Sequence, residues 1–289
     1  MRYIYYHSAD LDGHCSGEIA YRALYEQNNS NIKLIGINYG EPLQSHIDTD
    51  EIWFVDFCPD IMPEAGIITI IDHHKTKDYI QVDINAGKYR GEVNSSGATP
   101  SERVSACELC WKWFYNPYHM PLFVRLLGRY DVWDHFNPQV LPFQYGMRTY
   151  DTTPGQGEVW DELFNGNSIE QICMIGDRLI FKEEKDNSIR MKHAFSYKLI
   201  APGGIHVIYV IASIGAPCSS QAFKSVYDAS HHIAMMSIVS RGPLGWRISL
   251  YNNNDQMDLT PIAKAFGGGG HAHACGFQVK SLKCLGLEL

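Results

Sequence analysis

The sequence lacks several features that define particular protein classes. The 289-residue chain has no apolar run of about 18 residues, so we expect no membrane-spanning helix. Its start, MRYIYY, passes directly into polar residues without the apolar core of a signal peptide. The 8 cysteines are scattered along the chain, far below the density of a disulfide scaffold. These absences predict a cytoplasmic protein in a reducing compartment.

Positive charge is also scarce. The chain has 24 Lys and Arg against 32 Asp and Glu, and its formal net charge is −8. A broad grip on duplex nucleic acid needs a basic face, so this balance argues against such binding. A small phosphorylated substrate remains compatible, because divalent cations bound at a carboxylate-rich site reverse the local sign of charge.

The first half of the chain alternates strand and helix signals. Strand-like segments lie at 3–6, 31–38, 51–55 and 67–71, and helical patterns lie at 17–27, 99–113 and 120–129. This alternation predicts an α/β domain with a mostly parallel sheet and helices on both faces.

The second half predicts a connection and a smaller mixed α/β domain. A short helix is expected at 155–167, a long helix at 168–195 and a turn at 201–204, followed by strands at 207–212, 233–240 and 247–251 and helices at 219–226 and 259–266. We therefore assign 1–166 to a catalytic domain, 167–200 to a connecting helix and linker, and 201–289 to a substrate-binding domain.

The tripeptide Asp72-His73-His74 follows the apolar run 66–71 directly. Open α/β sheets place their chemistry at the carboxyl ends of strands, where these three polar groups emerge together. Two histidines beside a carboxylate can hold a divalent metal and leave one imidazole for the substrate.

Three other acidic clusters also follow apolar segments. They contribute HSADLDG at 7–13, Asp56 in VDF and Asp131 in RYDVWD. Four converging carboxylates repel one another unless cations neutralise them, and oxygen-rich sites with one or two imidazoles suit Mn²⁺ or Mg²⁺. The candidate metal ligands are His7, Asp10, Asp12, Asp56, His73 and Asp131, enough for two ions if one carboxylate bridges them.

In this order the motifs resemble the DHH phosphoesterase superfamily, which includes oligoribonuclease-like and RecJ-like phosphodiesterases. GGGGHAHACGF at 267–277 is similar to the substrate-binding signature of the DHH-associated C-terminal domain, so the resemblance covers nearly the whole chain. It implies two Mn²⁺ ions, with Mg²⁺ as the alternative. One ion would be held by His7, Asp10 and Asp56, and the other by Asp12, Asp56, His73 and Asp131.

The resemblance also implies catalytic roles for His74 and Asp72. His74 would contact the phosphate or assist the leaving group, and Asp72 would orient an imidazole. Three positions depart from the family pattern. Only Ser8 and Ala9 separate His7 from Asp10, Cys275 replaces the usual Ala, and Tyr251 stands where some relatives carry an Arg. Tyr251 can stack on a base instead.

The glycine run at 267–270 has a physical interpretation of its own. Backbone without side chains approaches anions closely, and successive N–H groups can form an anion-binding concavity. A helix beginning near His271 would add the attraction of its N-terminal dipole for phosphate. An isolated run of this kind is more often a flexible turn. The predicted substrate-binding residues are Gly268, Gly269, Gly270 and His271, facing the metals across an interdomain cleft.

The function implied is a metal-dependent phosphodiesterase that hydrolyses short RNA or DNA oligonucleotides to mononucleotides through a metal-activated water. Cyclic dinucleotides and 3′,5′-bisphosphorylated nucleotides fit the same motifs, as do pyrophosphate and polyphosphate. Against the last two, the segment after residue 260 holds only Lys264, Lys280 and Lys283 as Lys or Arg. A nucleotide-binding sensor without catalysis is the non-enzyme alternative, and a homodimer is compatible by analogy.

Other reactive side chains have simpler interpretations. Cys107-x-x-Cys110 lies on an expected helix without a second pair, which favours packing over zinc binding. Arg129 is expected to pair with a carboxylate rather than with phosphate, and His14 to lie on the surface or at a helix start.

Overall fold

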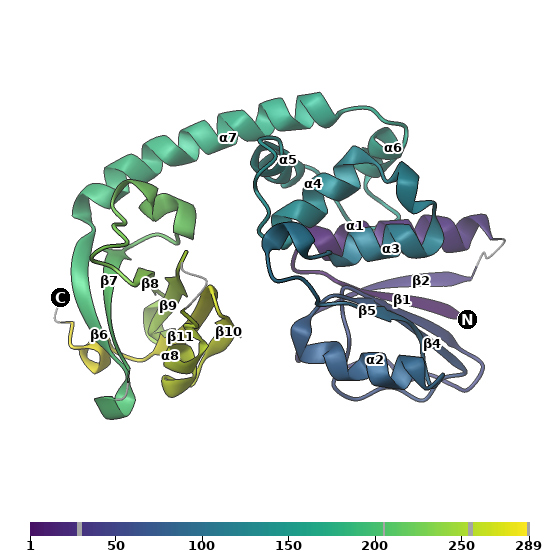
Figure 1. The fold of residues 1–289 in the computed structure, drawn as a ribbon, viewed down its shortest axis with the longest axis horizontal. Helices are drawn as coiled ribbons and strands as arrows, with labels where there is room; N and C mark the ends of the chain where they lie inside the picture. Colours follow the sequence, from purple (N-terminus) through teal and green to yellow (C-terminus); the bar gives the residue numbers. More distant parts are fainter. Residues whose placement is uncertain (28–30, 205, 254–256, 288–289) are drawn as a thin grey trace. The chain divides into compact units, whose positions relative to one another are not determined.

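The computed structural model describes residues 1–27, 31–204, 206–253 and 257–287. The chain divides into two compact units, Met1–Ile180 and Phe181–Leu289, and the division falls within the long helix α7 (Ile169–Arg190). Each unit contains its own sheet (Figure 1). Among the described residues, no helix combines the length and apolar character needed to cross a bilayer.

The first unit is built on a parallel sheet of order β2-β1-β3-β4-β5 in the described part of the chain. Its strands are β1 (Arg2–His7), β2 (Ile32–Ile37), β3 (Glu51–Val55), β4 (Ile67–Asp72) and β5 (Arg90–Val93). The chain moves from β1 outward to β2 and then to β3 on the opposite side of β1. Loops therefore diverge at the carboxyl ends of β1 and β3, which is where open α/β sheets bind ligands.

Helices cover both faces of this sheet (Figure 1). One face carries α1 (Leu11–Glu26), α3 (Ala106–Phe114) and α4 (Leu122–Asp131), with α5 (Val140–Met147) and α6 (Glu158–Phe164) beyond them, and the other carries α2 (Asp78–Asn85). Successive side chains of a strand point to opposite faces. Accordingly, Ile4 and Tyr6 pack in the core of the first face and Tyr5 in the core of the second.

The second unit is built on a mixed sheet of order β10-β11-β9-β8-β7-β6 in its described residues. Its strands are β6 (Phe195–Ile200), β7 (Val207–Ile214), β8 (Ala234–Ser240), β9 (Trp246–Tyr251), β10 (Gly269–His271) and β11 (Ala274–Val279). Only β7 and β8 pair in parallel among the described neighbours. Ile248, Leu250 and Phe277 form its core with helix α8 (Thr260–Ala265).

The predicted fold class is confirmed, but several element boundaries differ. Helix α1 begins at Leu11 rather than at 17, because the Asp10 side chain caps it. The single helix expected at 99–113 is two elements, a 3₁₀ turn at Pro100–Glu102 and then α3. Helix α3 begins after Ser105, whose side chain forms a capping box with Glu108. The helix expected at 219–226 is a 3₁₀ segment, Ser220–Ser225.

Candidate metal centre

His7 and Asp10 occupy the turn between β1 and α1. His7 is the last residue of β1, and Asp10 caps α1 through a 2.9 Å hydrogen bond that its Oδ1 accepts from Gly13 N. The second carboxylate oxygen lies 2.8 Å from His7 Nδ1. A Cβ on Gly13 would come within 2.0 Å of the His7 carbonyl oxygen, so only glycine allows this close approach.

Asp56 is the central carboxylate of the cluster. It follows β3 directly and is 1% exposed, and its backbone has φ +54, a left-handed conformation that costs an L-residue roughly 1–2 kcal/mol. Its Oδ2 lies 3.5 Å from His7 Nδ1, and its Oδ1 lies 3.4 Å from His73 Nε2. Asp56 thus faces both halves of the cluster, and its strained backbone is of the kind found at functional sites.

The other half of the cluster gathers around His73. Its Nε2 lies 3.2 Å from an oxygen of Asp131, the last residue of α4, and 3.8 Å from an oxygen of Asp12 in the first turn of α1. The ligand atoms of Asp12, His73 and Asp131 all lie within 4.8 Å of one another, as do those of His7, Asp10 and Asp56. The structure therefore brings all six predicted ligands into two adjacent groups.

Asp12 is held by the start of α3, a contact that the sequence analysis missed. Its two oxygens accept hydrogen bonds from Ala106 N at 2.9 Å and Cys107 N at 3.0 Å. The amino end of a helix stabilises negative charge, which suits a carboxylate that is only 3% exposed. The Ser105-x-x-Glu108 capping signature was the available signal that α3 begins here rather than at 99.

Asp72 is fully buried and faces His74. Its Oδ1 accepts hydrogen bonds from the backbone N–H groups of His73 at 2.7 Å and His74 at 3.2 Å, and lies 2.7 Å from His74 Nδ1. Burial opposes protonation of His74, but Asp72 and the nearby Asp56 outweigh it and raise the pKa of this imidazole. Asp72 therefore sets the orientation of the His74 ring and favours its protonated form.

The cluster carries more negative charge than its own side chains balance. Burial, with the charges of Asp56 and Asp131, raises the pKa of Asp12 well above its usual range. Burial also raises the pKa of Asp131 to about 6, although His73 opposes this shift. For His7, burial acts to lower the pKa, but Asp10 and Asp56 raise it to about 10.

These groups fit divalent cations. Among the described residues, His7 Nδ1 and Asp56 Oδ1 are buried without a hydrogen-bond partner, although other polar atoms lie close to them. Several ligand atoms thus lie in short contact without hydrogen-bond geometry, and the carboxyl pKa values of Asp12 and Asp131 are raised. Both features indicate that these atoms point toward common positions that a cation could occupy. A set of carboxylate oxygens and imidazole nitrogens is typical of an Mn²⁺ or Mg²⁺ site, whereas a thiolate-type zinc site is built from other ligands.

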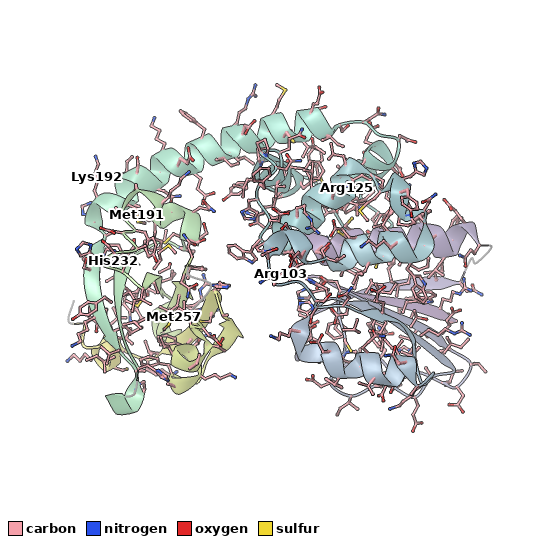
Figure 2. All side chains as sticks on the ribbon, in the orientation of Figure 1. Arg103, Arg125, Met191, Lys192, His232 and Met257 are labelled. Carbon is pink, nitrogen blue, oxygen red and sulfur yellow. The ribbon has the colours of Figure 1, made fainter. Side chains whose placement is uncertain are left out.

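The structure also places Arg129, His14 and the two cysteines of the Cys107-x-x-Cys110 pattern. Arg129 pairs with Glu108 and donates a 2.8 Å hydrogen bond to the carbonyl of Arg103, which Figure 2 labels. His14 points at Thr152, with Nδ1 2.8 Å from its hydroxyl oxygen. Cys107 and Cys110 are free thiols buried in the core.

The glycine run of the second unit lines a separate pocket of about 570 Å³. Residues of β9 share this lining, among them Arg247, Ser249 and Tyr251, which alternate along the strand and so face one side of the sheet. Arg247 was not among the residues predicted from the sequence. Its period-two spacing from Tyr251 was the signal that placed a cation beside the glycines.

The condition that a helix begins near His271 is not met, since Gly269–His271 form a strand. Helix α8 instead ends just before the glycines, and Gly267 N and Gly268 N donate to the carbonyls of Lys264 and Ala263, both at 2.9 Å. Gly267, with φ +79, closes the helix in a Schellman-type cap, so these N–H groups are already used. Residues Gly269–His271 form β10, and the His271 side chain lies outside the described part of the structure.

The three predicted substrate-binding glycines differ in what they tolerate. A Cβ on Gly268 would come within 2.0 Å of the Gly276 carbonyl oxygen, and Gly270 has φ +132 and lies against Cys275. Around Gly269 no described atom lies within 4 Å of such a Cβ. Packing therefore requires glycine at 268 and 270, whereas 269 is open to the pocket.

Comparisons with known proteins identify the fold. No protein-family model matches the chain. An uncharacterised protein, R106, of Acanthamoeba polyphaga mimivirus is 22% identical over 241 residues, which cover 79% of this chain and 52% of that protein. The chain thus spans about half the length of this curated relative.

Two solved structures share the architecture. A pGpG-specific phosphodiesterase, PggH, from Vibrio cholerae has a TM-score of 0.52 at 12% identity, covering 96% of this chain and 93% of that one. An exopolyphosphatase-related protein from Bacteroides fragilis has a TM-score of 0.53 at 12% identity, covering 96% and 86%. At this identity the likeness shows the fold, and it confirms the two-unit α/β architecture that the DHH phosphoesterase resemblance implies.

Proposed function

We propose that this chain is a metal-dependent phosphodiesterase that cleaves short oligonucleotides to mononucleotides. The observation that carries the proposal is the position of Asp56, whose two oxygens face His7 on one side and His73 on the other at 3.5 and 3.4 Å. A carboxylate so placed can be shared by two cations. His7, Asp10 and Asp56 would hold one, and Asp12, Asp56, His73 and Asp131 the other, with Mn²⁺ favoured and Mg²⁺ as the alternative.

Bound divalent cations would supply an acidified water and neutralise the charge of the phosphate. The chain's own residues would do the rest. Asp72 holds Nδ1 of His74, which leaves Nε2 to meet the phosphate or to give a proton to the leaving oxygen. Within the second unit, Arg247 beside the open edge at Gly269 would offer a guanidinium group for a phosphate.

Two substrate classes compete, nucleotides and polyphosphates. By their names, one solved relative is specific for pGpG and the other is exopolyphosphatase-related. A panel decides between them. Linear dinucleotides, cyclic dinucleotides, 3′,5′-bisphosphorylated adenosine and pyrophosphate are each incubated with Mn²⁺ and with a chelator. We expect mononucleotides from the linear dinucleotides only when Mn²⁺ is present. Turnover of pyrophosphate alone, or turnover that survives the chelator, would contradict the proposal.

A further inference from the structure

A second pocket lies beside the metal cluster within the first unit. It has a volume of about 470 Å³, within the range of small-ligand sites. Two loops form it, 39–43 after β2 and 57–63 after β3, so it opens at the carboxyl edge of the sheet next to the end of β1. Its apolar lining includes Tyr39, Phe57, Leu43 and Met62.

The side chain of Tyr39 lies between this pocket and the metal cluster. Its ring centroid lies 5.7 Å from that of His7 and 5.9 Å from that of His74. On the pocket side it lies 5.0 Å from Phe57, which is buried and backs the ring. Tyr39 itself is 44% exposed and lines the pocket, so part of its side chain is accessible to a ligand. A group seated against Tyr39 is therefore adjacent to the imidazoles of the cluster.

The charged side chains that line this pocket are carboxylates. Its charged lining residues among the described side chains are Glu41 and Asp60. Lys77 Nζ lies 2.5 Å from Asp60, which is therefore paired with a cation, and 5.6 Å from the Tyr39 ring centroid. The carboxylates of this lining can accept hydrogen bonds from ring N–H and amino groups. A flat, neutral heteroaromatic ring with such donors matches both the aromatic and the acidic lining.

We propose that this pocket receives the nucleobase of the nucleotide next to the scissile phosphate. The proposal rests on the phosphodiesterase function proposed above and narrows its substrates to phosphodiesters that carry a base. Stacking on an aromatic side chain contributes enough per base that its removal weakens binding by about tenfold or more. The pocket thereby gives nucleotide substrates an advantage that pyrophosphate and polyphosphate do not have.

The test compares a dinucleotide with an abasic analogue that has the same sugars and phosphodiester. In the wild-type chain with Mn²⁺, we expect the KM for the dinucleotide to be about tenfold lower or more. Tyr39→Ala should remove this difference between the two substrates, whereas Tyr39→Phe should retain it. Tyr118→Ala, at an exposed tyrosine in the 3₁₀ turn Pro117–His119, is the matched control.

The outcomes separate the two proposals. Equal KM values for both substrates in the wild-type chain would overturn the base pocket and leave the phosphodiesterase function intact. Equal losses on both substrates in Tyr39→Ala would also overturn it, because Tyr39 would then act by positioning His7 or His74. Absence of turnover of either phosphodiester would overturn the function itself. Binding of AMP against ribose 5-phosphate to the metal-free protein, measured by calorimetry, gives a readout independent of activity, and equal affinities would count against the pocket.

Discussion

The Oδ1 atom of Asp72 lies 2.7 Å from Nδ1 of His74. The same oxygen accepts the backbone N–H groups of both histidines, so one buried carboxylate fixes the backbone and the ring together. Asp72 is the last residue of β4, so this contact fixes the His74 imidazole relative to a rigid strand.

Asp72→Asn should lower kcat by roughly 10- to 100-fold, because the ring loses the negative charge that favours its protonated form. KM and metal stoichiometry should change little, since Asp72 faces His74 rather than the two ligand groups. Steady-state kinetics with calorimetric Mn²⁺ titration measure both effects. Wild-type kcat in this variant would show that Asp72 serves only to stabilise the fold.

Asp56→Asn should abolish activity and reduce the number of bound Mn²⁺ ions below two. Asparagine tolerates the left-handed backbone found at this position, so the fold should persist. Circular dichroism and Mn²⁺ titration check the two statements. Asp161→Asn, at an exposed carboxylate on α6, is the control and should behave as the wild type. Two ions bound in Asp56→Asn would refute the shared role of Asp56.

Gly268→Ala should change the stability of the second unit, whereas Gly269→Ala should change the KM for the substrate. The first places a Cβ 2.0 Å from the Gly276 carbonyl oxygen and should destabilise the second unit by about 1–3 kcal/mol. The second points into open space and should leave the melting temperature unchanged while raising KM. If Gly269→Ala changes neither quantity, the glycine run has a packing role and no contact with substrate.

Metal binding should release protons and strengthen as pH rises. The pKa of His7 is about 10 in the metal-free fold, above the value of about 6.5 expected in the unfolded chain. The stabilisation from protonated His7 is therefore complete below pH of about 6.5 and is lost as pH rises through about 10. A cation must displace this proton, so apparent affinity should increase with pH across the same window.

Calorimetry at pH 7 in two buffers of different ionisation enthalpy measures the released protons. Thermal unfolding of the metal-free protein across this pH range measures the loss of stability. Buffer-independent heats of Mn²⁺ binding would exclude His7 as a ligand that must be deprotonated.

The sequence by itself was enough to predict the α/β class, and the six residues that it proposed as metal ligands lie close together in the structure. The fold class and the positions of His7, Asp56 and His73 follow from local patterns, because apolar runs mark buried strands and the polar groups at their ends emerge at one sheet edge. Boundaries that depend on side-chain caps, such as the start of α1 at Asp10, were predicted less well.

Tertiary structure decided what depends on partners distant in the chain. The support of Asp12 by Ala106 N joins residues 94 positions apart, and no local pattern encodes it. The glycine run forms a helix cap and then a strand, because β11 pairs with it. Tyr39 lies between a pocket and two histidines because β2 and β3 lie on either side of β1. Periodicity reports which side of an element is buried, whereas the identity of the group packed against that side is set by the folded topology.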